Sequence, residues 1–138
     1  MELEFVLEQA GHDVVGIATD TRQALTLAAE AKPELALVDI NLKDGDSGVR
    51  VARLISSQLN VTVLFATAEP ELIPEQFGGA YGVVVKPYSG PSVEAAVEYC
   101  LALRDGVDPG PQPSQLLLAP WVSAKREAED GGSGEGMH

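Results

Sequence analysis

Asp39, Thr67 and Lys86 each come directly after a short apolar run. An aspartate that attacks a phosphoryl group forms an acyl phosphate. Such a transfer requires positive charge beside the accepting oxygen and little covalent help from the protein. The three residue types therefore suggest phosphoryl transfer onto Asp39, with Lys86 as the neutralising cation and Thr67 as a hydrogen-bond donor to the phosphoryl oxygens.

A metal ion would assist the same chemistry. Mg²⁺ prefers hard oxygen ligands and usually keeps several of its waters. Asn41 follows Asp39 by two residues, and its backbone carbonyl is an oxygen ligand of this kind. We therefore expect a Mg²⁺ site with Asp39 and Asn41 as protein ligands.

The surrounding sequence alternates between helical and strand periodicity. Strands are predicted at residues 13–18, 35–40, 61–66 and 82–85, and helices at residues 3–10, 21–31, 46–59 and 91–106. This alternation is typical of an α/β fold, a doubly wound parallel sheet with helices on both faces. Ligands of such sheets bind at the carboxyl ends of the strands, where the three polar residues stand. The alternative is that polar residues merely end the strands, but three different chemical groups at three ends favour a site.

Three segments resemble, in order and spacing, the receiver domain of response regulators in two-component phosphorelays: LALVDINLKDGDSG, VTVLFATAEPE and GVVVKPY. The resemblance covers about residues 1–106 and implies a flavodoxin-like receiver fold. It also implies that Asp39 is the phosphoacceptor, Thr67 the hydroxyl that moves toward the phosphoryl group, and Lys86 the ion-pairing lysine. The implied function is a signalling module, not an enzyme, that receives its phosphoryl group from a histidine kinase or phosphotransfer protein and signals to a downstream protein by conformational change.

The segment FATAEPELIPEQFGGAYGVVVKPY is similar to a receiver subgroup with a FAT motif and a short fourth helix, often served by HWE-type histidine kinases. Val83 stands where most receivers carry an aromatic switch residue, so an aromatic rotamer switch is not expected there. An alternative from another class is a small flavodoxin-like or phosphatase-like enzyme. It is disfavoured because no second strand-end carboxylate is available as its acid or base.

The first strand of the receiver family, with the acidic pair that holds Mg²⁺, has no counterpart in this sequence. The predicted fold therefore lacks its first strand, and Mg²⁺ binding is expected to be weakened or absent. This departure favours an alternative function, a pseudo-receiver that binds proteins without being phosphorylated. Because the strands at 13–18 and 35–39 would present unpaired edges, the chain is expected to self-associate as a homodimer or to unfold at modest temperature.

Composition limits the remaining possibilities. The chain has 138 residues, 45% of them hydrophobic, which suffices for one domain with a core. Its formal net charge of -12 would repel nucleic acids and anionic membranes, and no apolar run is long enough to span a bilayer. The N-terminus is acidic, unlike a signal peptide, and the single cysteine, Cys100, is expected in the core. These features predict a cytoplasmic protein that binds neither nucleic acid nor membrane.

Residues 107–138 are predicted to be a partly disordered tail after the receiver domain of residues 1–106. Proline and glycine dominate residues 107–112, and residues 127–138 have the composition of a disordered segment. Between them lies the apolar segment SQLLLAPWVSAKRE, with three interpretations: a peripheral segment on an exposed core face, a partner-binding segment, or a strand in the vacant sheet position. Pro120 opposes the third. Trp121 is expected to be a packing anchor.

Overall fold

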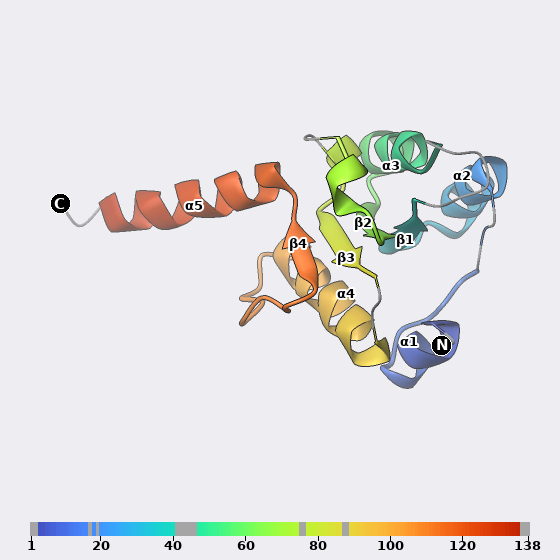
Figure 1. The fold of residues 1–138 in the computed structure, drawn as a ribbon, viewed down its shortest axis with the longest axis horizontal. Helices are drawn as coiled ribbons and strands as arrows, with labels where there is room; N and C mark the ends of the chain where they lie inside the picture. Colours follow the sequence, from blue (N-terminus) through green and yellow to red (C-terminus); the bar gives the residue numbers. More distant parts are fainter. Residues whose placement is uncertain are drawn as a thin grey trace.

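The computed structural model describes residues 3–16, 18, 20–40, 47–74, 77–86 and 89–135 (Figure 1). Within these residues the sheet has four strands in the order β1-β2-β3-β4, namely β1 (Leu35–Asp39), β2 (Thr62–Thr67), β3 (Gly82–Val85) and β4 (Leu116–Leu118). The first three are parallel, and β4 is antiparallel to β3. The predicted strands at 35–40, 61–66 and 82–85 are therefore confirmed.

Helices cover both faces of this sheet. They are α1 (Leu3–Gln9), α2 (Thr21–Ala31), α3 (Ser47–Gln58), α4 (Gly90–Arg104) and α5 (Pro120–Glu135), with short 3₁₀ turns η1 (Pro70–Leu72) and η2 (Phe77–Gly79). One face packs on α2 and α3, and the other packs on α4, with α1 against α4. The predicted α/β receiver fold is confirmed, with β4 making the sheet mixed.

The central strand β2 is buried at all six positions, because helices lie on both of its faces. Its side chains alternate between two hydrophobic clusters. Phe65 belongs to the cluster under α2 and α3, and Leu64 to the cluster under α4. The continuous apolar run in the sequence thus reflects burial on both sides of the sheet.

Local capping fixes two of the helices. The Asp20 carboxylate accepts a hydrogen bond of 2.9 Å from the Gln23 backbone N–H and begins α2. Ser89 and Ser92 cap α4 reciprocally, each side chain accepting from the other's backbone N–H. These bonds satisfy backbone donors that a helix N-terminus leaves without intrahelical partners.

The strand predicted at residues 13–18 is wrong for the described residues of that segment, 13–16 and 18, which form no strand. A strand needs a neighbour to pair its backbone groups. In the described part of the chain only β2 pairs with β1, and no strand lies beyond β1 to receive residues 13–18. The apolar pattern is that of a strand, but no strand of the described residues lies where it could pair with this segment.

Two C-terminal elements differ from the predictions for residues 107–138. The strand β4 lies beside β3, and not in the vacant position beside β1. Pro120 lies outside the strand and begins α5, which extends to Glu135 where disorder was predicted from residue 127 onward. One reason is that the helix starts from packed residues, with Val122 buried and Trp121 against Tyr81 as the expected anchor, and continues through good helix formers at residues 124–128, before the glycine-rich residues 131–134.

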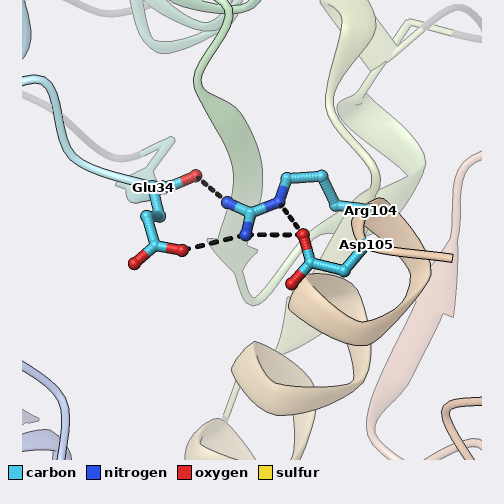
Figure 2. A network of polar contacts seen from close by, with 3 residues as sticks. All are labelled: Glu34, Arg104 and Asp105. Atoms are coloured by element: carbon cyan, nitrogen blue, oxygen red, sulfur yellow. Dashed lines mark hydrogen bonds and ion pairs between the residues drawn. The ribbon is translucent and has the colours of Figure 1, made fainter. Parts of the chain in front are cut away.

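A polar network joins α4 to the segment before β1, at the amino end of β1 and therefore at the opposite end of this strand from Asp39 (Figure 2). Arg104 lies 2.9 Å from the Glu34 carboxylate and also bonds the Glu34 backbone carbonyl and the Asp105 carboxylate. Hydrogen bonds to Glu34 and then Asp105 raise the pKa of Arg104, so its guanidinium stays charged. The network holds the C-terminal end of α4 against the amino end of β1.

Cys100 is fully buried in α4, as predicted, and burial raises the pKa of its thiol to about 12. A thiol with a raised pKa stays protonated at every pH below that value, and the thiolate is the reactive form. We expect Cys100 in the folded chain to resist a thiol reagent at about pH 8 and to react promptly in denaturant. The rate of absorbance change with an aromatic disulfide reagent measures this, and equal rates in both conditions would contradict the packing.

Candidate functional site

The predicted site residues lie at one edge of the sheet. Asp39 ends β1, Thr67 ends β2, and Lys86 follows the last residue of β3, Val85. The parallel register pairs Asp39 with Ala66 and Thr67 with Val85, so the three strands end at nearly the same level. The carboxyl ends of the three strands thus bring a carboxylate, a hydroxyl and an ammonium to the same side of the sheet, because the strands are parallel.

Lys86 and Asp39 form a direct ion pair. The Lys86 Nζ atom lies 2.9 Å from Asp39 Oδ2. The Asp39 side chain is 47% exposed and that of Lys86 is 26% exposed, so the carboxylate is reachable from solvent. A cation already bound to the carboxylate would also neutralise the charge of an incoming phosphoryl group, and the pair therefore has the geometry of an acceptor site.

Thr67 is almost fully buried, with 2% of its surface exposed. Its Oγ1 accepts a hydrogen bond of 3.1 Å from the Glu69 backbone N–H. A threonine hydroxyl that accepts still has its proton to donate. The Thr67 carbonyl in turn accepts from the Lys86 backbone N–H at 2.8 Å, which ties the ends of β2 and β3 together.

Gly48 positions the next helix against the site and was not singled out from the sequence. A Cβ at this buried position would lie 3.2 Å from Ile40 Cα and 3.6 Å from the Asp39 carbonyl oxygen. The absence of a side chain lets the start of α3 lie against the backbone that follows Asp39. The sequence feature that could have indicated this role is a glycine in the first turn of a predicted helix, because nearly every other residue type forms helices better than glycine.

The expected Mg²⁺ site is only partly visible. Asn41 lies outside the described residues, and among those described no three acidic, histidine or cysteine side chains gather to hold a metal ion. Asp39 is therefore the one predicted ligand whose place is known, and one carboxylate does not make a metal site. Mg²⁺ binding by Asp39 and Asn41 stays a prediction.

Val83 occupies the position at which most receivers carry an aromatic switch residue. Val83 is fully buried in β3 and belongs to the cluster under α2 and α3. Tyr81, two residues earlier, instead packs edge-on against Trp121 of α5, with ring centroids 5.1 Å apart. Burial raises the pKa of Tyr81, which keeps its hydroxyl protonated. The aromatic contact of this region therefore links β3 to the C-terminal helix.

Comparisons with known proteins agree with this arrangement. Residues 1–98 match the response regulator receiver domain. The chain is 36% identical over 104 residues to the phyllosphere-induced regulator PhyR of Methylorubrum extorquens, covering 73% of this chain and 39% of that protein. The chain thus spans less than half the length of this relative.

Solved receiver structures show the same fold. The receiver domain of PhyR from Erythrobacter litoralis matches with a TM-score of 0.62 at 36% identity, covering 72% of this chain and 78% of that chain. The anti-anti-sigma factor PhyR from Bartonella quintana matches with a TM-score of 0.62 at 31% identity, covering 75% of this chain and 43% of that chain. Because residues 1–98, more than half of the chain, match the response regulator receiver domain, the chain belongs to that family.

Proposed function

We propose that the chain is a phosphorylated receiver module that accepts a phosphoryl group on Asp39. The observation that carries this proposal is the Lys86 ammonium 2.9 Å from a half-exposed Asp39 carboxylate at the carboxyl edge of the sheet. The donor is a histidine kinase, of HWE type by the FAT motif, or a phosphotransfer protein. Either donor would meet the module in the cytoplasm.

The transfer itself is a simple displacement. An Asp39 carboxylate oxygen attacks the phosphorus of a phosphohistidine, and the phosphorus–nitrogen bond breaks as the new phosphorus–oxygen bond forms. The Lys86 ammonium neutralises charge on the phosphoryl oxygens, and the Thr67 hydroxyl donates a hydrogen bond to one of them after a local movement that exposes it. Mg²⁺ bound by Asp39 and the Asn41 carbonyl would add positive charge, but no step depends on its placement.

The downstream partner is proposed to be a protein. The net charge of -12 opposes binding to a nucleic-acid backbone. One solved relative is described as an anti-anti-sigma factor, which suggests a partner among protein regulators of transcription. The chain covers 43% of that relative, so this partner class is a proposal for the receiver part.

Labelling with a small acyl phosphate tests the acceptor. Incubation with and without Mg²⁺ is expected to add one phosphoryl group that is stable in acid and labile in base, and only slowly, because Mg²⁺ binding is expected to be weakened. Asp39→Asn is expected to abolish the labelling, because an amide is a far weaker nucleophile than a carboxylate. Intact mass spectrometry measures the added group.

The matched control is Asp108→Asn, which removes a carboxylate from an exposed loop and should label like the natural chain. Equal labelling of the Asp39→Asn chain would overturn the assignment of the acceptor. Absence of labelling from every donor, in a chain that still binds its partner, would favour the phosphorylation-independent pseudo-receiver.

A further inference from the structure

Residues 107–135 form a C-terminal arm, containing β4 and α5, that is held along the edge of β3. Residues 82–84 pair with β4 in antiparallel register. Two more hydrogen bonds extend this ladder, from the Val85 N–H to the Gln115 carbonyl at 3.1 Å and from the Ala119 N–H to the Tyr81 carbonyl at 2.7 Å. The arm is therefore bonded along the full length of β3.

Gly82 makes this pairing possible. A Cβ at Gly82 would lie 2.5 Å from the Leu117 carbonyl oxygen and 3.2 Å from Leu118 Cα. Both atoms belong to the backbone of β4, which cannot rotate away as a side chain can. Any larger residue at this position would therefore push β4 off the edge of the sheet.

Two side chains of α5 anchor the rest of the arm. The Trp121 indole donates a hydrogen bond of 2.9 Å to the Ala80 carbonyl and packs on Tyr81. Arg126 hydrogen-bonds the Tyr99 hydroxyl of α4. Beyond these contacts α5 extends away from the body of the domain (Figure 1). Trp121 is the only tryptophan of the chain, so its fluorescence reports on the arm alone.

One end of the ladder lies next to the candidate site. Val85, which bonds the arm, immediately precedes Lys86, which binds Asp39. In the sheet order, Asp39 on β1 and the arm lie on opposite sides of β3. A displacement of the Lys86 end of β3 toward Asp39 would therefore lengthen the hydrogen bond between Val85 and Gln115 of the arm. A phosphoryl group adds roughly two negative charges at neutral pH and would strengthen the pull on Lys86 toward Asp39.

We propose that the C-terminal arm is a conformational device that senses the charge at Asp39. More negative charge at Asp39 loosens the ladder from its Val85 end, and loss of the Asp39 charge tightens it. A phosphoryl group can act in this way because it interacts differently with the docked and the released arm. The phosphorylated state in this inference rests on the proposed function, whereas the effect of the unmodified carboxylate does not.

The test follows hydrogen exchange of residues 115–119 and the emission of Trp121 in the full-length chain. Phosphorylation is expected to speed exchange several-fold and shift the emission to longer wavelength. Asp39→Asn is expected to slow exchange by about two- to threefold, a small effect because the ion pair is partly exposed. In a Lys86→Gln background the same substitution at Asp39 should have no effect, as a double-mutant cycle would show.

Two reference variants calibrate the signals. Gly82→Ala provides the released arm, with circular dichroism to check that the remaining domain is folded. Leu117→Ala removes an exposed side chain of β4, keeps its backbone bonds and should resemble the natural chain. The comparison of the natural chain with the Asp39→Asn chain does not depend on either reference.

The outcomes separate the two proposals. Equal exchange in the natural and Asp39→Asn chains overturns the coupling, whether or not the chain takes phosphate. Unchanged exchange in a chain that mass spectrometry shows to be phosphorylated overturns it as well. A chain that takes no phosphate counts against the proposed function alone, and slower exchange in its Asp39→Asn variant would still support the device.

Discussion

Replacing Phe65 by alanine is expected to lower the free energy of unfolding by about 3 to 5 kcal/mol, the usual cost of emptying a core aromatic site. Phe65 is 0% exposed at the centre of β2. Its ring lies 6.4 Å from that of Phe77, at an angle of 51°, so the substitution also removes an aromatic contact. A single domain has only about 5 to 15 kcal/mol of stability, so most of the margin would be lost.

Urea unfolding followed by circular dichroism measures this change. Phe5→Ala is the matched control, because Phe5 is 58% exposed on α1. Its effect is expected to stay within about 0.5 kcal/mol, as for other surface substitutions. Similar losses in both variants would show that Phe65 is not at the centre of the core.

An apolar strand attached before Met1 is expected to raise the stability of the chain by at least about 2 kcal/mol. In the described part of the chain β1 pairs on one side only, with β2, and three of its apolar side chains stay partly exposed. Each new backbone bond contributes about 0.5 to 1.5 kcal/mol net, and covering the apolar edge adds to this. An open apolar edge also favours association with a second chain.

Thermal unfolding and analytical ultracentrifugation measure both effects. The extended chain is expected to be a monomer with a melting temperature higher by roughly 8 °C, whereas the 138-residue chain is expected to self-associate. An extension of equal length made of glycine and serine is the control and should change neither property. A monomeric natural chain as stable as the extended one would show that the edge of β1 needs no partner.

The sequence predicted that Asp39, Thr67 and Lys86 lie together at the ends of parallel strands, because strand ends are easily read from it. Apolar runs of strand length between helical segments indicate a parallel sheet, and in a parallel sheet all carboxyl ends meet at one edge. Asp39 and Lys86 are 47 positions apart in the chain and still form an ion pair. Once the strands were predicted correctly, their meeting followed from topology.

The sequence predicted the pairing of strands less well, because pairing depends on neighbours that no local pattern specifies. Residues 13–18 have a strand pattern but form no strand over their described part. Conversely, β4 has three residues and follows a Pro/Gly-rich segment, yet it pairs because Gly82 leaves room for its backbone. Such a close approach becomes visible only when both strands are placed in space.

Locating the phosphoryl group on the chain tests the central claim most directly. An acyl phosphate is reduced by borohydride to an alcohol, which marks the acceptor residue permanently for peptide mapping by mass spectrometry. If Asp39 is the acceptor, the reduced residue is expected at position 39 in the natural chain and nowhere in the Asp39→Asn chain. A reduced residue at another carboxylate, with position 39 unchanged, would contradict the assignment.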